Sequence, residues 1–354
     1  MKILVAAGAS GGHIFPALSF MQALKENQAL LVLPKKSIKD ELAPGNFQIK
    51  YISISNIGLR PSLNNCISFF NFLKASFESF FLMLEFRPDV VVGFGSLACV
   101  PLVIFGWLFR IKTLIHEQNV VPGRANRFLA QLAEKTAISF EQSRKYLKVD
   151  PEKIILTGNP LRRELKIINR NEALKFFGFE ESFTLLVMGG SQGSHRINEY
   201  FVQALSGLRD LSRFQIIHIC GKTDYETLLK KYRQLNCKFR LFPFLKEMQY
   251  AYSASDLALS RAGATTITEL IYFTLPAVII PYPFAYAHQL ENAKVLEAGR
   301  SAVVINDTEL KVEGLRQVLL DLINDPAKLK RMREGFKAFP KNDAASLLAK
   351  EVLS

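Results

Sequence analysis

The chain begins Met1-Lys2-Ile3-Leu4-Val5-Ala6-Ala7-Gly8-Ala9-Ser10-Gly11-Gly12-His13, and half a chain later it reads Phe183-Thr184-Leu185-Leu186-Val187-Met188-Gly189-Gly190-Ser191-Gln192-Gly193-Ser194. Both stretches consist of a short apolar run, a glycine-rich turn and the start of a helical pattern. In a parallel sheet, such a turn joins the carboxyl end of a strand to the helix that follows. The repeat therefore predicts two Rossmann-like domains.

Apolar, β-branched runs of strand length recur through both halves and alternate with helical patterns. Strands are expected at residues 2–6, 30–33, 90–92, 113–115, 183–188, 214–219 and 277–280. This alternation is typical of an α/β fold whose parallel sheets carry helices on both faces. The length of 354 residues also exceeds the size at which a single core usually stops growing.

The predicted domain boundary lies near the turn Gly158-Asn159-Pro160. It gives an N-terminal domain at residues 1–160 and a C-terminal domain at 161–335. Their sheets are expected to face a central cleft, with ligands at the carboxyl ends of the strands. The last segment, 336–354, has a charged helical pattern, and its return onto the N-terminal domain is left open.

The composition favours an anionic partner, because 45 Lys and Arg against 32 Asp and Glu give a net charge of +13. Nucleic acid is not expected, since the basic residues are scattered and no zinc-finger or RNA-recognition signature is present. The four cysteines lack CxxC spacing, so neither a zinc site nor a disulfide framework is expected. The first apolar stretch is too short for a signal peptide, and a reducing cytoplasm fits this composition.

Residues 90–109 carry no charge over twenty positions and would pass a simple hydropathy test for a transmembrane helix. However, residues 90–92 have the pattern of a buried parallel strand, and Gly93-Phe94-Gly95-Ser96 interrupts it. Pro101 falls where a helix would begin. We therefore predict a strand, a glycine loop and a buried helix.

His13 directly follows the glycines of the first turn. Such a turn lets backbone N–H groups approach an anion, although it can also be a mere packing turn. The turn does not match GxGxxG, and no acidic residue ends the second strand, so NAD is not expected. An imidazole at a helix amino terminus is held in its neutral form, which suits a general base.

Polar residues gather after later strands as well. The second turn offers the Ser191 hydroxyl to a phosphate, and residues 260–270 form a loop entering a helix, rich in N–H groups and hydroxyls. Glu269 is close enough to contact a ribose, or it complements the helix dipole. His116-Glu117-Gln118-Asn119 and His288-Gln289 are expected at the same sheet edges. His195 and His218 lack such a context and are treated as ordinary residues.

Seven motifs occur in the order and spacing of the MurG family, which the sequence strongly resembles from Lys2 to about Leu296. They are Gly11-Gly12-His13, Gly93-Phe94-Gly95, His116-Glu117-Gln118-Asn119, Thr157-Gly158-Asn159-Pro160-Leu161-Arg162, Gly189-Gly190-Ser191-Gln192-Gly193, Arg261 to Glu269 and His288-Gln289. The resemblance implies the glycosyltransferase B architecture. It also implies transfer of N-acetylglucosamine from UDP-N-acetylglucosamine to the 4-hydroxyl of undecaprenyl-diphospho-N-acetylmuramoyl-pentapeptide, the step from lipid I to lipid II in peptidoglycan synthesis.

The resemblance also implies roles for individual residues. Arg162 and the backbone near Leu245 would lie at the uracil, and Ser191 at a phosphate. The helix-end amides of Ala264, Thr265 and Thr266 would bind the diphosphate, Glu269 the ribose and Gln289 the sugar hydroxyls. From the N-terminal domain, Ser10, Gly11, Gly12 and Asn119 would contact the sugar, and the acceptor diphosphate would lie against the first glycine turn.

The expected chemistry is one in-line displacement that inverts the anomeric carbon. His13 is the first candidate for the base and Glu117 the second. No Asp-x-Asp motif is present, so we expect neither a bound metal nor another cofactor. The first turn reads Gly8-Ala9-Ser10-Gly11-Gly12, where the family usually has Gly-Gly-Thr-Gly-Gly. Alanine is tolerable there only if its backbone does not need a positive φ.

Three other functions compete with this interpretation. A related lipid glycosyltransferase acting on diacylglycerol would share the fold and some glycine turns. A UDP-N-acetylglucosamine epimerase would share the fold but has little need for a membrane-facing surface. A non-catalytic nucleotide-sugar-binding protein would be expected to have degraded motifs, and these motifs are intact.

The segment 68–86 carries more large apolar side chains than one core-facing stripe needs. Part of it must pack inside, and a merely well-buried helix is the alternative. Lys74, Arg87 and Arg60 could meet anionic headgroups while exposed phenylalanines enter the bilayer interface. We therefore predict peripheral binding to an anionic surface at the cytoplasmic face of the cell membrane.

Overall fold

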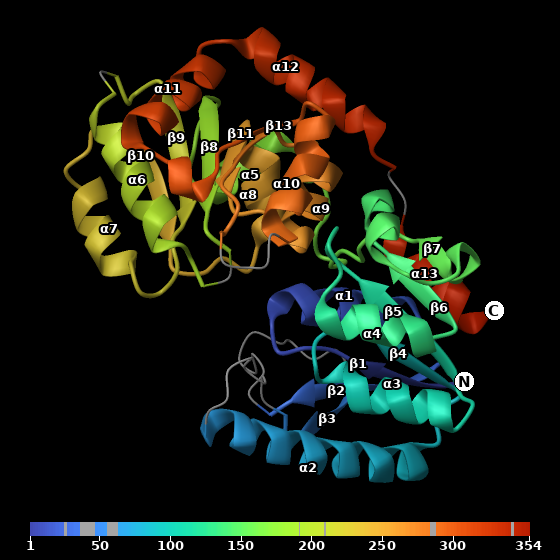
Figure 1. The fold of residues 1–354 in the computed structure, drawn as a ribbon. Coiled ribbons are helices and arrows are strands. Elements are labelled where there is room, and N and C mark those ends of the chain that lie inside the picture. Colours follow the sequence, from blue (N-terminus) through green and yellow to red (C-terminus); the bar gives the residue numbers. More distant parts are fainter. Residues whose placement is uncertain are drawn as a thin grey trace. The chain divides into compact units, whose positions relative to one another are not determined.

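The computed structural model describes residues 1–24, 27–35, 47–54, 63–190, 192–208, 210–283, 288–340 and 343–354. The chain divides into two compact units, whose elements are labelled in Figure 1. Unit 1 comprises Met1–Arg162 and Asn342–Ser354, and unit 2 comprises Arg163–Lys341. Each unit has its own parallel sheet, and each is described by itself below.

Unit 1 is built on seven parallel strands in the order β3-β2-β1-β4-β5-β6-β7. Their bounds are β1 (Lys2–Ala6), β2 (Gln28–Pro34), β3 (Gln48–Ile52), β4 (Val90–Gly93), β5 (Lys112–Glu117), β6 (Lys135–Ile138) and β7 (Ile154–Leu156). The central strand β1 pairs with β2 on one side and with β4 on the other. The order reverses between β1 and β4, so the turns after these two strands lie at the switch point where α/β sheets bind ligands.

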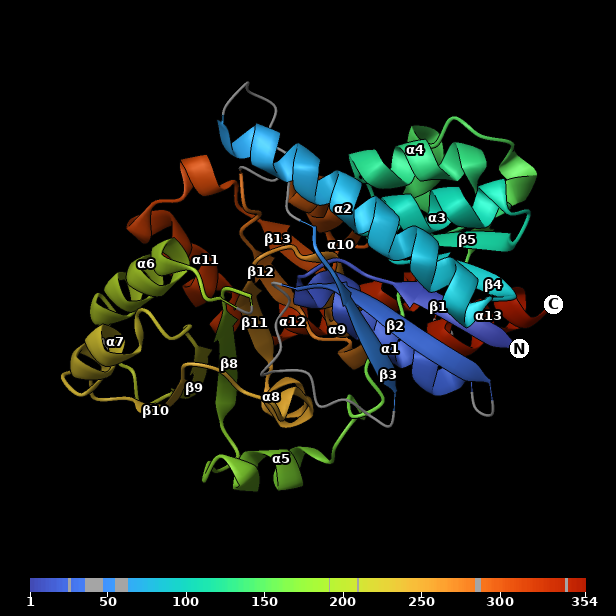
Figure 2. The same cartoon turned by 90° about the horizontal axis from the view of Figure 1, so that it is seen from below.

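Helices cover both faces of this sheet. They are α1 (Gly11–Ala23), α2 (Leu63–Phe86), α3 (Cys99–Leu108), α4 (Arg124–Leu132) and α13 (Ala344–Leu353). Successive side chains of a strand point to opposite faces. Accordingly, Ile3 and Val5 of β1 pack in one core with α1 and α13, while Leu4 and Ala6 pack in another with α2, α3 and α4. Figures 1 and 2 show α1 and α2 on opposite faces.

The last helix, α13, is part of unit 1 although 180 or so residues of unit 2 precede it. Leu348, Ala349 and Val352 join the core beneath α1. At the other face of the helix, the Lys135 ammonium lies 2.6 Å from the Glu351 carboxylate. The segment from residue 343 onward therefore completes the core of unit 1.

Unit 2 contains six parallel strands in the order β10-β9-β8-β11-β12-β13. Their bounds are β8 (Phe183–Met188), β9 (Phe214–Ile219), β10 (Lys238–Phe242), β11 (Leu257–Ser260), β12 (Ala277–Ile279) and β13 (Ala302–Val304). The order reverses between β8 and β11, which places the turns after these strands at the second switch point. The helices are α5 (Arg170–Phe176), α6 (His195–Ser206), α7 (Tyr225–Tyr232), α8 (Met248–Ala254), α9 (Ala264–Phe273), α10 (His288–Ala298), α11 (Val312–Ile323) and α12 (Pro326–Gly335).

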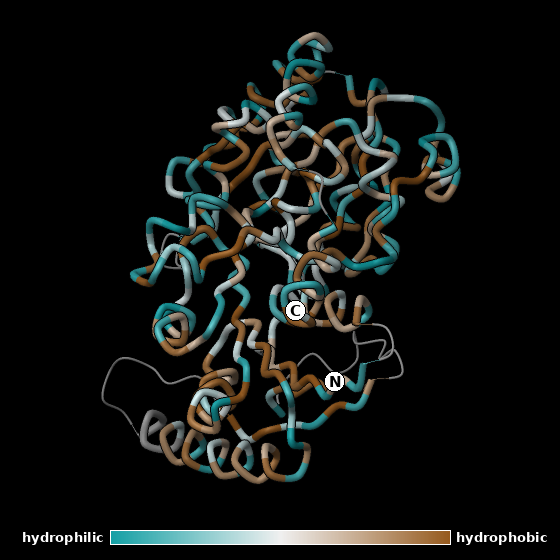
Figure 3. The backbone as a smooth tube through the Cα atoms, turned by 90° about the vertical axis from the view of Figure 1, so that its right-hand side faces the viewer, coloured by the Kyte–Doolittle hydropathy of each residue, from teal (hydrophilic) through white to brown (hydrophobic). Residues whose placement is uncertain are grey.

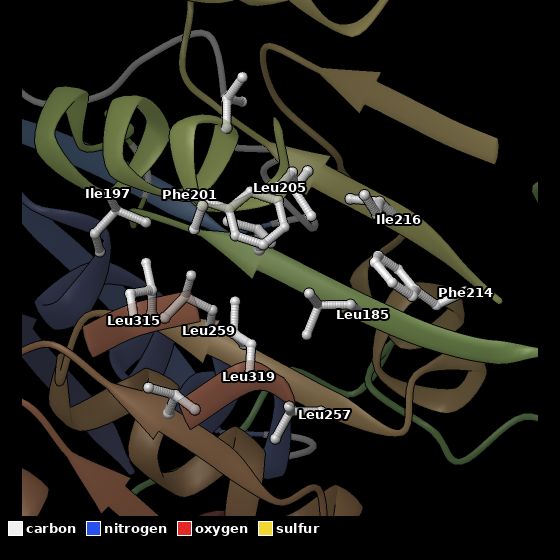
Figure 4. Close-up of a cluster of buried hydrophobic side chains, with 14 of the residues drawn as sticks. Leu185, Ile197, Phe201, Leu205, Phe214, Ile216, Leu257, Leu259, Leu315 and Leu319 are labelled. Atoms are coloured by element: carbon white, nitrogen blue, oxygen red, sulfur yellow. The ribbon is translucent and has the colours of Figure 1, made fainter. Parts of the chain in front are cut away.

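The core of unit 2 joins one face of the sheet to α6 and α11. Leu185 of β8 and Leu259 of β11 lie against Phe201 of α6 and Leu319 of α11, and all four are fully or almost fully buried (Figure 4). This packing fixes the directions of β8 and β11 and of the helix that follows β8. It therefore also fixes the switch point at their carboxyl ends.

All seven expected strands are present, with ends shifted by no more than two residues. Six further strands were not expected: β3, β6, β7, β10, β11 and β13. Most of these are short; β11, for example, has four residues and is buried throughout. A buried run this short has no periodicity that separates it from a loop.

The charge-free stretch 90–109 forms the predicted strand, loop and helix, although the helix is buried only over its first turns and Trp107 and Leu108 at its end are exposed. Val90–Gly93 is the buried strand β4, and Cys99–Leu108 is the helix α3, with Pro101 in its first turn, where proline is tolerated. No helix in the part of the chain that the structure describes is both long and apolar enough to cross a bilayer.

Candidate active site

The turn between β1 and α1 brings His13 against the loop after β4. A β-carbon added to Gly8 would lie 2.8 Å from the His13 Nδ1 and 2.5 Å from the Ser96 β-carbon, so only glycine fits there. On the other side, the Gly95 position lies beside the His13 ring, and Gly95 has a φ of +84°. The two switch-point turns of unit 1 therefore hold the imidazole between them.

His13 is in the first turn of α1, whose N-cap is Ser10. Its Nδ1 lies 3.0 Å from the Ser10 Oγ. The residue keeps part of its surface accessible, yet the ring is enclosed by enough protein for desolvation to lower the pKa of the imidazole from 6.5 to about 4. His13 is therefore neutral at physiological pH, as a general base must be.

The amides of Gly11 and Gly12 begin α1, and Ser10 makes no side-chain cap to them. The first N–H groups of a helix have no intrahelical partner and carry the positive end of its dipole. Ala9 is not among the described residues with a positive φ. The alanine of this turn is thus compatible with its backbone.

His116 and Gln118 are structural groups at the end of β5. The buried His116 donates from Nε2 to the Gly158 carbonyl at 2.9 Å, and its Nδ1 accepts from the Gln118 amide at 3.1 Å. Burial lowers the pKa of His116 to about 4. Both nitrogens are therefore used, and the ring ties β5 to the segment that leaves β7.

Glu117 is enclosed by donors. Its carboxylate accepts from the backbone N–H of Asn119 at 2.8 Å and of Gly123 at 3.0 Å, and from the side-chain amides of Asn119 at 3.2 Å and Asn126 at 2.8 Å. The residue is only 2% exposed, and burial raises the pKa of the carboxyl against the opposing effect of these donors. The carboxylate therefore shapes the loop that carries Asn119, which is half-buried.

In unit 2, the glycine turn after β8 touches the loop after β9. A β-carbon on Gly193, whose φ is +78°, would collide with the Cys220 carbonyl. The turn then enters α6, where the Ser194 Oγ accepts from the Ile197 N–H at 3.5 Å. Ser191, the expected phosphate contact, lies outside the described residues.

The turn after β11 enters α9 at Ala264, with Gly263 as N-cap and no side-chain cap. Ala264, Thr265 and Thr266 form its first turn, so their N–H groups have the expected orientation toward the carboxyl edge of the sheet. Glu269 lies further along α9 and is 7% exposed, and its carboxylate accepts from the Tyr252 hydroxyl at 2.6 Å. This contact fixes the carboxylate in one orientation.

Gln289 joins two neighbouring loops. Its Oε1 accepts from the backbone N–H of Ala262 at 3.1 Å and of Tyr282 at 2.9 Å, which leaves its Nε2 as the donor for other groups. Leu245 is buried in the loop after β10, at the same edge of the sheet. Arg162 is the last residue of the first segment of unit 1, with its guanidinium 4.8 Å from the centre of the Phe15 ring.

Some groups at these edges were not expected from the sequence. Arg261 was part of a quoted motif, but its buried partner Asp307 carries no sequence signal. Tyr252 and Asn126, which hold Glu269 and Glu117, were likewise missed. Each is distant in sequence from its partner or separated from it by an irregular loop. Nothing in the spacing of the sequence pairs them.

His195 and His218, which the sequence left unassigned, have partners within unit 2. His218 is fully buried, hydrogen-bonded to the Tyr232 hydroxyl at 2.9 Å and to the Asn198 side-chain Oδ1 at 3.0 Å, and burial lowers its pKa to about 3. His195 is an exposed residue 2.9 Å from the Asp224 carboxylate. Among the described side chains, no group of three or more His, Cys, Asp or Glu could hold a metal ion. The three cysteines whose side chains are described are free.

Comparison with known proteins covers nearly the whole chain. The model of the glycosyltransferase family 28 N-terminal domain matches residues 3–138, and that of the family 28 C-terminal domain matches 184–348. The UDP-N-acetylglucosamine--N-acetylmuramyl-(pentapeptide) pyrophosphoryl-undecaprenol N-acetylglucosamine transferase of Thermodesulfovibrio yellowstonii is 36% identical over 349 residues, covering 96% of this chain and 95% of its own. The enzyme of the same name from Geobacter sulfurreducens is 36% identical, covering 100% and 98%.

Solved structures agree with these relatives. MurG of Acinetobacter baumannii has a TM-score of 0.78 at 26% identity, with 100% of this chain and 99% of that chain covered. The calicheamicin glycosyltransferase CalG4 has a TM-score of 0.72 at 12% identity, covering 99% and 97%, and shares the fold alone. The two parallel-sheet domains have the glycosyltransferase B architecture. With 36% identity along nearly its whole length, the chain belongs to the MurG family of glycosyltransferases.

Proposed function

We propose that this chain transfers N-acetylglucosamine from UDP-N-acetylglucosamine to the 4-hydroxyl of undecaprenyl-diphospho-N-acetylmuramoyl-pentapeptide, with inversion at the anomeric carbon. The observation that carries the proposal is the neutral His13 beside the uncapped amides of Gly11 and Gly12, in a chain whose full-length relatives bear the name of this reaction. The product is the lipid-linked disaccharide used in peptidoglycan synthesis.

The donor is assigned to the carboxyl edge of unit 2. The first-turn amides of Ala264, Thr265 and Thr266 bind the diphosphate, because uncapped N–H groups and the helix dipole stabilise negative charge. Glu269, oriented by Tyr252, accepts hydrogen bonds from the ribose hydroxyls. The Nε2 of Gln289 donates to a sugar hydroxyl, since its Oε1 is occupied by backbone.

Further donor contacts rest on the family resemblance. Arg162 and the backbone near Leu245 bind the uracil, and Ser191 binds a phosphate. Ser10, Gly11, Gly12 and Asn119 contribute contacts to the transferred sugar from unit 1. The acceptor diphosphate binds the glycine turn before α1, where Gly11 and Gly12 begin the helix.

Proton removal is assigned to His13. If its Nδ1–H donates to the Ser10 Oγ, its Nε2 has a free lone pair. Nε2 takes the proton of the muramoyl 4-hydroxyl while the oxygen forms its bond to the anomeric carbon. The bond from that carbon to the UDP oxygen breaks in the same step, and UDP leaves with the electron pair. A single displacement inverts the configuration.

Glu117 is assigned a positioning role in place of the second candidate base. Burial raises its pKa, which by itself would favour a base, but its two oxygens already accept four hydrogen bonds. A proton from a substrate would have to displace one of these donors. The carboxylate is better suited to hold the Asn119 to Gly123 loop in shape for the sugar contact.

Charge on the departing UDP is met by helix-end amides without a bound metal. The amino terminus of α9 supplies N–H groups that are already oriented, so they stabilise the developing charge without reorganisation. This is the electrostatic contribution that a divalent cation supplies in many other transferases.

A single experiment with three arms tests the function. Labelled UDP-N-acetylglucosamine is supplied with the muramoyl lipid, with diacylglycerol, or with no acceptor. We expect label to enter the muramoyl lipid alone. Transfer to diacylglycerol would identify the related lipid glycosyltransferase, and loss of UDP-sugar without an acceptor would indicate epimerisation or hydrolysis.

We infer that unit 1 binds the membrane through α2 and the end of α3. Phe70, Phe77 and Phe81 of α2 are 69%, 68% and 63% exposed. Figure 3 shows α2 at the bottom of the view, with hydrophobic residues along most of its turns. A soluble surface rarely carries so many large apolar side chains on one helix, which supports a lipid or protein contact.

The exposed apolar surface extends from α2 onto α3. Phe80 packs inward with ring centres 5.6 Å from Phe105 and 6.0 Å from Phe109, joining the two helices. Trp107 and Leu108 at the end of α3 are 51% and 59% exposed, and Trp is common at bilayer interfaces.

Cationic side chains border the apolar surface. Lys74 and Arg87, at α2, and Arg110, after α3, are exposed and suit anionic headgroups; Arg60 lies outside the described residues. The polyprenyl acceptor is itself held in the bilayer, so we propose peripheral binding at the cytoplasmic face of the cell membrane.

A further inference from the structure

Arg261 follows β11 and is only 8% exposed, yet it is a charged side chain. Its guanidinium donates from Nη2 to the Ser194 Oγ at 2.9 Å, and from Nη1 to the carbonyls of Ile280 at 3.1 Å and Pro281 at 3.3 Å. Nη1 also donates to the carboxylate of Asp307. These acceptors belong to the loops after β8, β12 and β13, so one side chain joins the carboxyl-edge loops of four neighbouring strands.

Asp307 extends this link to α6. It is 6% exposed, and its second oxygen lies 3.4 Å from the guanidinium of Arg196, the second residue of that helix. Removing a guanidinium and a carboxylate from water is costly, and a buried ion pair often stabilises a fold no more than apolar residues would. The pair is therefore better explained by the geometry it imposes than by the stability it provides.

That geometry concerns the helix ends at the switch point. Ser194 is the N-cap of α6, and Arg261 precedes Gly263, the N-cap of α9. Strands β8 and β11, which lead into these turns, are neighbours in the sheet. The guanidinium thus connects the two helix amino termini directly. All four bonds that the guanidinium makes from Nη1 and Nη2 go to protein acceptors, which suits a group that positions these loops.

We propose that Arg261, held by Asp307, is a positioning residue that sets the spacing of the α6 and α9 amino termini around the donor diphosphate. The inference rests on the proposed function, which assigns that diphosphate to this edge of unit 2. It predicts that loss of Asp307, which has no place among the proposed ligands, weakens diphosphate recognition through Arg261.

The chain offers a matched control at the opposite edge of the same sheet. Asp256, just before β11, also receives two arginines: Arg170 at 2.9 Å and Arg333 at 2.9 Å. Its Oδ2 additionally accepts from the Thr184 N–H at the start of β8. Asp256→Asn therefore removes a carboxylate charge that pairs with two arginines, as Asp307→Asn does. It does so in the same sheet, but at the amino ends of the strands.

The experiment measures affinity for UDP and for uridine by titration calorimetry or competition, together with the thermal unfolding midpoint, in the full chain. We expect Asp307→Asn and Arg261→Lys each to weaken UDP binding about 10-fold or more, as for loss of a charge-assisted hydrogen bond. Uridine affinity should change less than about 2-fold by the same reasoning, since the nucleoside makes no diphosphate contact. Asp256→Asn should lower the unfolding midpoint and leave the UDP-to-uridine affinity ratio unchanged.

Each other result overturns the inference in a recognisable way. If Asp307→Asn keeps the parent's ratio of UDP affinity to uridine affinity while Arg261→Lys lowers that ratio, Arg261 would be a direct ligand of the diphosphate. An equal loss of UDP affinity relative to uridine affinity in Asp256→Asn would show that the effect is general destabilisation of unit 2. If Asp307→Asn does not fold, the two edges of the sheet can instead be compared through their arginines. Arg261→Lys should then weaken UDP binding relative to uridine, and Arg170→Lys should not. A parent protein that fails to bind UDP would instead refute the proposed function itself.

Discussion

At the scale of single residues, His13 and Glu117 show how surroundings decide which of two candidate groups can act. His13 begins the helix after β1 and Glu117 ends β5, and burial favours the neutral form of each by lowering the pKa of His13 and raising that of Glu117. In His13, Nδ1 bonds to Ser10, and Nε2 is left to accept a proton. In Glu117, by contrast, the two carboxylate oxygens already accept four hydrogen bonds. Hydrogen-bond geometry therefore supports the proposal that His13 is the base and that Glu117 shapes the loop.

His13→Ala is expected to lower kcat by about 10² to 10⁴, the range for loss of a general base, with UDP affinity largely retained. His13→Gln, which can still bond to Ser10 but cannot take a proton, should be as slow. Glu117→Gln keeps the size of the side chain but removes its charge. The variant enzyme should therefore be affected mainly in KM for the sugar donor. A near-normal kcat in both His13 variants would transfer the role of base elsewhere.

The pH profile of kcat/KM provides a separate check on His13. Because desolvation lowers its pKa to about 4, the ring stays neutral until the pH falls well below the 6.5 of ordinary histidine. Activity of the parent should therefore be maintained as pH decreases through 6.5 and be lost near pH 4 to 5. An acid limb centred at 6.5 would show that the catalytic imidazole is not desolvated in the free enzyme.

Glu269→Ala is expected to weaken binding of UDP by roughly 1 to 3 kcal/mol, as for lost hydrogen bonds to a charged group. The matched variant Tyr252→Phe removes the hydroxyl that orients the carboxylate and should have a smaller effect in the same direction. Affinity for UDP and for a ribose-lacking uracil compound should be compared. Equal losses for both would place Glu269 away from the ribose.

At the scale of elements, α2 combines a packed side with an apolar exposed side. Leu82, Met83 and Phe86 belong to the core of unit 1, while Phe77 and Phe81 are exposed. Phe80, which the sequence pattern could not distinguish from its neighbours, packs against α3. The structure therefore selects which phenylalanines test membrane binding.

Phe77→Ser/Phe81→Ser is expected to reduce sedimentation with vesicles containing anionic lipid, without changing the affinity for soluble UDP. Added salt should weaken binding of the parent, because headgroup attraction is screened within about 10 Å at 0.1 M. Phe80→Ser is the control for packing and should lower the thermal unfolding midpoint. If the parent does not bind anionic vesicles, or the double variant unfolds, α2 is not the membrane contact.

The amino terminus of α9 makes a prediction about metal dependence. Its first-turn amides are assigned to the charge that develops on UDP, so transfer should continue at an undiminished rate in excess EDTA. A chelator-treated preparation with and without added Mg²⁺ is the comparison to make. Loss of activity in EDTA that Mg²⁺ restores would contradict the assignment.

At the scale of the whole molecule, stability and function depend on two separately built units. Each has a buried histidine near the carboxyl ends of its strands: His116 in unit 1 and His218 in unit 2, both fully buried. Burial lowers their pKa values to about 4 and about 3. Both are neutral members of hydrogen-bond networks, so both units should share a sensitivity to acid.

Stability in urea is expected to decrease as pH falls from about 6.5 to 4, because the unfolded chain binds protons at these histidines before the folded chain does. Since one pKa unit corresponds to about 1.4 kcal/mol, each histidine contributes a loss on the order of 3 kcal/mol over this range. His116→Gln, which removes one titrating group, should reduce this decline but not abolish it, because His13 in the same unit also has a lowered pKa. A free energy of unfolding that is constant from pH 7 to 4.5 would refute this.

Much of the fold and of the site could be predicted because the decisive signals are local in sequence. Apolar runs ending in glycine-rich turns predicted the central strands β1, β4 and β8 and the turns that follow them, and His13 adjoins its glycines directly. Short strands such as β11 escaped prediction, because four buried residues have no distinguishing period. Prediction thus succeeded where neighbours along the chain are also neighbours in space.

The sequence by itself determined the two-domain α/β plan, the family motifs and the identity of the polar residues at the strand ends, since periodicity and spacing are properties of a linear chain. Only the tertiary structure decided what those residues contact. It enclosed Glu117 with donors, paired Arg261 with Asp307 across 46 residues, and turned Phe80 inward beside the exposed Phe81. Burial and hydrogen bonding between distant segments depend on three-dimensional packing, and sequence spacing does not encode it.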